Sequence, residues 1–134
     1  MLDQVTVRTL GGNRVEAGNG RHRLVLDLPV HDGGAGEAMG PHEALLSALG
    51  ACTSMTLLLY ARRKTWPLEG VEIALGREKA PVGVPDGRER IQVDLRLHGP
   101  LDEEQRARLL DIAKKCPVYR SLTSDLDLVE RLVS

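Results

Sequence analysis

Two thiols, Cys52 and Cys116, are the side chains of this 134-residue chain best suited to covalent chemistry. Cys52 lies within residues 44–61, a stretch without charged side chains. Free cysteine is often a small buried hydrophobe, and burial raises the pKa of a thiol, so packing alone can explain Cys52. A reactive Cys52 needs a cation beside it that stabilises the thiolate.

Cys116 has a different local environment. It directly precedes Pro117, at the start of a predicted helical turn. Three basic residues are close in sequence: Lys114, Lys115 and Arg120. A helix N-terminus and positive charges both stabilise a thiolate, so the local sequence favours Cys116 as the more reactive thiol. A core-facing position at the end of a helix explains it equally well.

The sequence indicates no other common type of site. The cysteines are far apart, no Cys-x-x-Cys motif occurs and the four histidines show no ligand spacing, so we predict neither metal nor cofactor. No phosphate-binding loop or Gly-x-Ser-x-Gly motif is present. With 18 basic and 19 acidic residues, one Trp, two Tyr and no Phe, the chain has neither the charge nor the aromatic platforms for nucleic acid.

The length fits one domain, residues 1–134. Alternating apolar and polar residues predict strands over 4–10 and 23–28, with glycine-rich turns between them, and over 70–78 and 90–99. A turn-rich segment, 80–87, connects the last two strands. Their apolar positions are expected on one face: Val71, Ile73, Leu75, Ile91, Val93, Leu95 and Leu97.

A long helix is predicted from Pro41 or His42 to Arg63, after a glycine-rich loop over 31–40. Pro67 ends it, because the residue before a proline avoids helical geometry. The helix is apolar nearly all round and is therefore expected inside the structure. Small residues at helical spacing would let a second backbone come close: Ser47, Gly50, Ala51 and Ser54.

A second helix is predicted to begin at Asp102, with Gln105 in the capping-box position. Its apolar side consists of Leu109, Ile112, Ala113 and Cys116. A helical turn over 118–122 and an alternating strand over 125–133 complete the chain. Strands, helix, strands, helix and strand in this order predict an α+β fold with mainly antiparallel pairing.

A helix that is apolar on nearly all sides is hard to cover in one small domain. The sequence therefore predicts a homodimer in which two such helices meet through their small residues. Residues 44–61 also reach the length of a membrane span, but four hydroxyl residues dilute the stretch and charges flank it, which favours a soluble protein. Two cysteines and the absence of a basic, apolar leader favour the cytoplasm.

Two segments resemble a known family. Residues 40–73, GPHEALLSALGACTSMTLLLYARRKTWPLEGVEI, and residues 114–122, KKCPVYRSL, together resemble the OsmC/Ohr family of thiol peroxidases, most closely its OsmC-like (YhfA-type) branch. The resemblance extends over essentially the whole chain. It implies an OsmC-like α+β fold, in which antiparallel sheets wrap around a central buried helix in an intertwined homodimer.

The resemblance also implies a two-cysteine redox mechanism. Cys52 is the expected peroxidatic residue, whose thiolate attacks the O–O bond of a small organic hydroperoxide, releases the alcohol and becomes a sulfenic acid. Cys116 is then expected to resolve the sulfenic acid as a disulfide. An external dithiol, a dihydrolipoyl protein in the family, reduces that disulfide.

In the family, an arginine from the N-terminal strands activates the first cysteine, and a glutamate near the start of the central helix holds this arginine. By position the best matches are Arg14 and Glu43. The alternatives to Arg14 are the other N-terminal arginines, Arg8, Arg21 and Arg23. Glu43 departs from the hydroperoxide-reductase pattern by one residue, because His42 follows the proline. One residue rotates a side chain by about 100° around a helix.

Three functions therefore stay open. The first, which we predict, is a thiol-dependent peroxidase for organic hydroperoxides. The second is a non-catalytic OsmC-like binding or stress-response protein, in which both cysteines persist without an activating arginine. The third is a disulfide-exchange protein without peroxidase activity. The fold alone does not decide between them.

Overall fold

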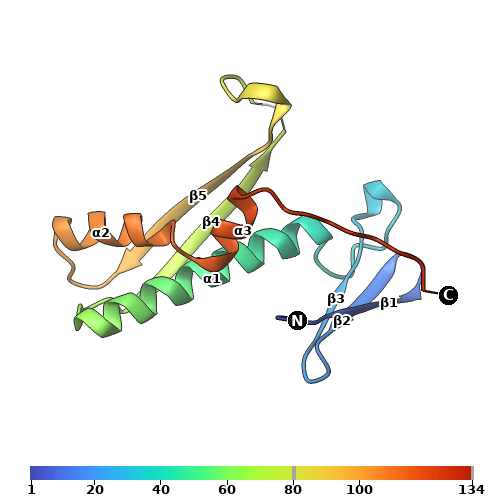
Figure 1. Cartoon of the computed structure of the whole chain (residues 1–134), viewed down its shortest axis with the longest axis horizontal. Coiled ribbons are helices and arrows are strands. Elements are labelled where there is room, and N and C mark those ends of the chain that lie inside the picture. Colours follow the sequence, from blue (N-terminus) through green and yellow to red (C-terminus); the bar gives the residue numbers. More distant parts are fainter. Residues whose placement is uncertain (80, 134) are drawn as a thin grey trace. The chain divides into compact units, whose positions relative to one another are not determined.

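Figure 1 shows the structure, a computed structural model that describes residues 1–79 and 81–133. The chain has a mixed α+β fold with antiparallel sheets, as the sequence predicts. It forms two compact units, Met1–Ser47 and Ala48–Ser134. Helix α1 (Pro41–Lys64) begins in the first unit and continues into the second.

The first unit contains a three-stranded antiparallel sheet in the order β1-β2-β3. Its strands are β1 (Thr6–Gly11), β2 (Arg14–Gly18) and β3 (Arg23–Leu26). The strands expected over 4–10 and 23–28 are confirmed. The expectation that only turns lie between them is wrong, because β2 lies there. Strand β2 has five residues, too few for a clear alternation, and is defined by its pairing with a strand on each side.

The loop between β3 and α1 is irregular, as expected for residues 31–40, except for a short 3₁₀ turn at its start, Val30–Asp32. It is held by Asp27, of which 2% is exposed. The Asp27 carboxylate accepts hydrogen bonds from the backbone N–H groups of Leu28 (2.7 Å) and Glu37 (3.2 Å). The loop therefore enters α1 from a defined position on the sheet.

Helix α1 confirms the predicted central helix and ends one residue later than expected. At its start, the Glu43 carboxylate accepts a hydrogen bond from the backbone N–H of Gly40 at 3.0 Å. At its end, the N–H of Trp66 donates to the carbonyl oxygen of Ala61 at 2.9 Å, and Pro67 follows. Both ends are thus set by local interactions.

The second unit contains an antiparallel hairpin of β4 (Gly70–Glu78) and β5 (Arg90–His98). Both strands match the prediction, with a register in which Ile73 faces Leu95. The apolar positions are half-buried and alternate with exposed polar positions, so they share one face as expected. A 3₁₀ turn, Pro85–Gly87, lies in the connection, of which Ala80 is outside the described residues.

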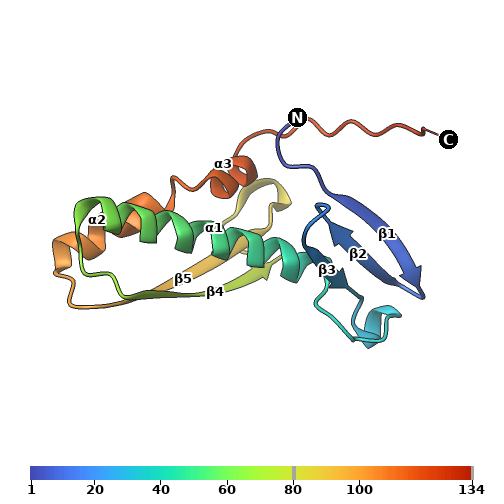
Figure 2. The same ribbon diagram turned by 90° about the horizontal axis from the view of Figure 1, so that it is seen from below.

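Helix α2 (Glu103–Ala113) begins with the predicted capping box. The Asp102 carboxylate accepts from the backbone N–H of Gln105 at 2.7 Å, and the Gln105 side chain accepts from that of Asp102 at 3.0 Å. In Figure 2, α1 and α2 lie on the same side of the β4–β5 hairpin. Between these elements lies the main core cluster: Leu57, Leu101, Leu109, Ile112 and Ala113.

Only one face of α1 is buried within the chain. The buried positions are Leu49, Gly50, Thr53, Leu57 and Ala61. On another face, Leu45, Met55 and Leu59 are 40%, 63% and 48% exposed. The small-residue strip predicted for a second helix is therefore divided. Ala51 is exposed, but Gly50 packs against Leu75 of its own strand β4.

By length and composition, α1 is also apolar enough to cross a membrane. Core helices of soluble proteins pass the same test. Leu57, near its middle, is fully buried against α2 and the hairpin, so this part of the helix belongs to the core of the second unit.

The predicted C-terminal strand is not present. Helix α3 (Pro117–Thr123) confirms the predicted helical turn, but the described residues that follow, 124–133, form no helix or strand. A strand is stable only when its backbone pairs with another strand, and 125–133 has no such partner within the described chain. Its apolar side chains are consequently exposed: Leu126, Leu128, Val129, Leu132 and Val133.

Candidate active site

The structure brings Cys52 and Cys116 together within the second unit. Cys52 lies half-buried on α1, next to the buried face of that helix. Cys116 is the residue at the start of α3 and is fully buried. Both are free thiols, and Cys116 is close enough to Cys52 to contribute to the raised pKa of the Cys52 thiol. Two thiols from distant parts of the chain are therefore close to each other.

Two further groups hold the sulfur of Cys116. The backbone N–H of Tyr119 donates to Sγ at 3.3 Å, which caps the first turn of α3. The hydroxyl oxygen of Thr53 lies 3.6 Å from the same sulfur. Thr53 is the neighbour of Cys52 in sequence and is 3% exposed. Neither Thr53 nor Tyr119 could be predicted from the sequence as a neighbour of Cys116, because these contacts form only when α3 folds and packs against α1.

The surroundings raise the pKa of the Cys52 thiol. Burial is the main cause, because it disfavours the charged thiolate. A backbone hydrogen bond from Val118 opposes this effect, the neighbouring Cys116 adds to it, and the Thr56 hydroxyl opposes it. None of these groups is a cation. Cys52 thus has a second thiol near it, but none of the groups that shift its pKa supplies a positive charge.

The basic residues near Cys116 in sequence do not contact its sulfur. Lys114, Lys115 and Arg120 are exposed, whereas Cys116 is buried and hydrogen-bonded to neutral groups. An effect of these charges on Cys116 therefore stays a prediction, because none of the three side chains hydrogen-bonds to the sulfur among the described residues. What the local sequence indicated correctly is the position of Cys116 at a helix start.

Arg14 and Glu43 do not form the expected pair. An Arg14 guanidinium nitrogen (Nη1) lies 3.2 Å from a carboxylate oxygen (Oε2) of Glu37, in the loop before α1. Glu43 instead accepts the hydrogen bond from Gly40, and among the described residues of the first unit it has no arginine partner. The shift of the acid by one residue explains this outcome, because it places the Glu43 carboxylate at the third helical position, where it caps α1.

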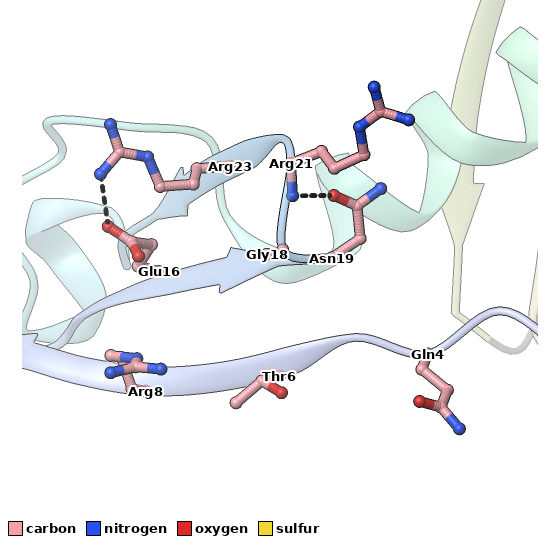
Figure 3. Close-up of a pocket in the computed structure, with 9 residues that line it drawn as sticks. Gln4, Thr6, Arg8, Glu16, Gly18, Asn19, Arg21 and Arg23 are labelled. Carbon is pink, nitrogen blue, oxygen red and sulfur yellow. Dashed lines mark hydrogen bonds and ion pairs between the residues drawn. The ribbon is translucent and has the colours of Figure 1, made fainter.

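The alternative arginines line a pocket of about 450 Å³ on the N-terminal sheet (Figure 3). A guanidinium nitrogen of Arg23 (Nη1) lies 3.8 Å from a carboxylate oxygen of Glu16 (Oε2). The backbone N–H of Arg21 donates a hydrogen bond to the side-chain oxygen of Asn19 at 2.9 Å. Arg8 lies on β1 on another side of the same pocket. All of its lining residues belong to the first unit, so this pocket contains neither cysteine.

No cluster of three or more His, Cys, Asp or Glu side chains suited to a metal ion occurs within 1–79 and 81–133. The thiol pair offers the second unit redox chemistry. Two neighbouring thiols can form a disulfide, and the more accessible of them, Cys52, can be reached by an oxidant first.

The fold agrees with the family comparison. Residues 34–130 match the OsmC-like protein family, and the chain belongs to this family. A search of proteins of curated function finds no match.

Solved structures with the same fold include a protein of Psychrobacter arcticus 273-4 assigned to the osmotic stress and detoxification response. It is 21% identical, has a TM-score of 0.74, and the alignment covers 90% of this chain and 88% of that one. The OsmC-like protein of Mycoplasma pneumoniae is 25% identical, with a TM-score of 0.71 and coverages of 91% and 89%. These similarities confirm the predicted OsmC-like fold.

A third similar structure is that of a Vibrio cholerae protein assigned to organic hydroperoxide resistance, with captopril bound in one of its active sites. It is 25% identical, has a TM-score of 0.65, and the alignment covers 95% of this chain and 89% of that one.

Proposed function

We propose that this protein is a thiol-dependent peroxidase that reduces organic hydroperoxides through Cys52 and Cys116. The observation that carries the proposal is the proximity of the two thiols, one half-buried on α1 and one fully buried at the start of α3. The similarity to the Vibrio cholerae protein assigned to organic hydroperoxide resistance supports the choice of oxidant.

The proposed reaction has two halves. The Cys52 thiolate attacks the terminal oxygen of R–O–OH, the O–O bond breaks, and the alkoxide takes a proton to leave as the alcohol while Cys52 becomes a sulfenic acid. The thiol of Cys116 then attacks this sulfur and expels water, which forms the disulfide. An external dithiol, for example a dihydrolipoyl protein, restores both thiols and is itself oxidised to a disulfide.

The raised pKa of Cys52 sets a condition on this function. The thiolate is the nucleophile, and burial works against it, so a cation must reach the sulfur. We propose Arg14 for this role, held by Glu37 rather than by Glu43. Arg8, Arg21 and Arg23 are the alternatives.

The first test is rapid-mixing kinetics of cumene hydroperoxide with the reduced protein. We expect wild-type protein to consume peroxide much faster than a free thiol and Cys52→Ser to show no consumption above background. Cys116→Ser should complete one turnover and leave a sulfenic acid at Cys52 that dimedone traps. Sulfenic acid at Cys116 in Cys52→Ser would reverse the two roles.

The same experiment separates the other functions. A disulfide-exchange protein would form the Cys52–Cys116 disulfide with diamide but consume peroxide no faster than a free thiol. A non-catalytic binding protein would do neither at a useful rate. Turnover with dihydrolipoamide supports the peroxidase.

We further propose that the protein acts as a homodimer in the cytoplasm, where thiol reductants keep cysteines reduced. Two features support the dimer: the exposed apolar face of α1, with Leu45, Met55 and Leu59, and the unpaired apolar segment over 125–133. Such surfaces are usually covered by another protein surface, and a second copy can offer a helix face and a strand partner at once.

A further inference from the structure

Thr53 is a buried residue with a hydroxyl group beside the thiol pair. The peroxidase reaction proposed above assigns no role to it. It lies on the buried face of α1, and its oxygen is 3.6 Å from Sγ of Cys116. A hydroxyl can accept a hydrogen bond from a thiol and can donate one to a thiolate. Thr53 can therefore remain bonded to Cys116 in both protonation states of the sulfur.

The two sulfurs also differ in access and in hydrogen bonding. Cys116 is fully buried, while Cys52 is half-buried. The sulfur of Cys116 has the Tyr119 N–H at 3.3 Å and the Thr53 hydroxyl at 3.6 Å. In thiol–disulfide exchange, access decides which sulfur is attacked, and stabilisation of the departing thiolate decides how fast it leaves.

We propose that Thr53 is a positioning residue for the reductive half of the cycle: its hydroxyl, with the Tyr119 N–H, receives Cys116 as the leaving thiolate, so that the reductant attacks Cys52. This inference rests on the two-cysteine centre proposed above. It does not depend on which oxidant forms the Cys52–Cys116 disulfide.

The exchange is balanced as follows. A thiolate of an external dithiol attacks Sγ of Cys52, the S–S bond breaks, and its electron pair goes to Sγ of Cys116, which leaves as a thiolate. The second thiolate of the reductant attacks the mixed disulfide on Cys52 and releases the Cys52 thiolate. Two protons from the dithiol end on the two protein sulfurs, and the reductant leaves as its disulfide.

The first test measures reduction of a disulfide formed with diamide, so no peroxide is needed. Thr53→Val keeps the shape and removes the hydroxyl, Thr53→Ser keeps the hydroxyl, and Ser54→Ala removes a hydroxyl from the next position as a control. We expect dithiothreitol to reduce Thr53→Val about fivefold to tenfold more slowly than wild type, because the leaving thiolate loses a donor. Thr53→Ser and Ser54→Ala should stay within about twofold of wild type.

A readout at the other sulfur separates this role from a structural one. The rate at which iodoacetamide alkylates reduced Cys52 should change by less than about twofold in Thr53→Val. An effect that is specific to Cys116 leaves the nucleophilic reactivity of Cys52 unchanged. Equal slowing of alkylation and of disulfide reduction, or a Thr53→Ser variant as slow as Thr53→Val, would overturn the proposal.

The second test uses wild-type protein and does not depend on the folding of a variant. The diamide-formed disulfide is treated with glutathione, quenched with acid, and the mixed disulfide is mapped by mass spectrometry. We expect glutathione on Cys52, and glutathione on Cys116 would contradict the proposed direction. If diamide forms no Cys52–Cys116 disulfide, both this inference and the two-cysteine centre fail. If these results hold but peroxide is not consumed, only the peroxidase function fails.

Discussion

Helix α1 and strand β4 meet at Gly50 and Leu75 as closely as a glycine permits, since a Cβ atom on Gly50 would lie 2.9 Å from Cδ1 of Leu75. Real Cβ contacts are essentially never this short. Gly50 therefore sets the distance between the helix that carries Cys52 and the hairpin that supports it. It serves the packing of its own chain rather than a helix contact with a second copy.

Replacement of Gly50 by leucine should destabilise the fold of each chain. We expect Gly50→Leu to lower the free energy of unfolding by about 1–3 kcal/mol, because the larger side chain overpacks the contact with Leu75. Urea unfolding followed by circular dichroism measures this effect. Ala74→Leu adds a leucine at an exposed position of β4 and should leave the free energy of unfolding nearly unchanged. Equal stability of the two variants would show that α1 and β4 are not in close contact.

The exposed face of α1 should control assembly. Met55 is 63% exposed in the single chain, and we expect Met55→Glu to convert a dimer to a monomer, since a carboxylate in an apolar interface loses its hydration. Sedimentation velocity at micromolar concentration measures the change. Leu110→Glu places the same charge on an exposed apolar position of α2, 54% exposed, and should leave the dimer intact. A monomeric wild-type protein would remove the basis for this prediction.

Arg14 should lower the pKa of Cys52 if it supplies the activating cation. The described neighbours of Cys52 raise its pKa through burial first, so in Arg14→Gln the midpoint of iodoacetamide alkylation against pH should lie above 9.0, the ordinary value. The wild-type midpoint should lie lower, and Arg14→Lys should recover part of the difference because it keeps the charge. Arg8→Gln is the control and should match wild type. If Arg8→Gln shifts the midpoint and Arg14→Gln does not, the cation is Arg8.

Asp27 should stabilise the first unit at neutral pH and lose this effect in acid. Its pKa is lowered from 3.8, first by the hydrogen bond from the Glu37 backbone, then by those from Leu28 and Ala35, while burial opposes the shift. A carboxyl with a lowered pKa contributes stability above its unfolded value and loses it as the pH falls through the folded value.

We therefore expect Asp27→Asn to unfold at lower urea concentration than wild type at pH 7. The difference should shrink as the pH falls below 3.8. Asp32→Asn changes an exposed acid in the same loop and should have a smaller effect. A difference between Asp27→Asn and wild type that does not vary with pH would mean that the Asp27 charge is not responsible.

Most of the secondary structure was predictable because its signals are local. The alternation in β4 and β5, the capping box of Asp102 and Gln105, and the prolines around α1 each act within a few residues. Strand β2 escaped prediction because it is short and exists through pairing with two neighbours. The strand expected over 125–133 was wrong for the converse reason, since its pattern is suitable but the described chain offers it no partner.

By itself, the sequence determined that α1 is a helix, that Cys116 starts a new one, and that the chain resembles the OsmC family, to which it belongs. Only the tertiary structure decided which face of α1 is buried. In a helix that is apolar on nearly all sides, the spacing of apolar residues does not distinguish one face from another. The same packing placed Thr53 beside Cys116 and Arg14 beside Glu37. Contacts between distant segments depend on how elements pack, and no local pattern records them.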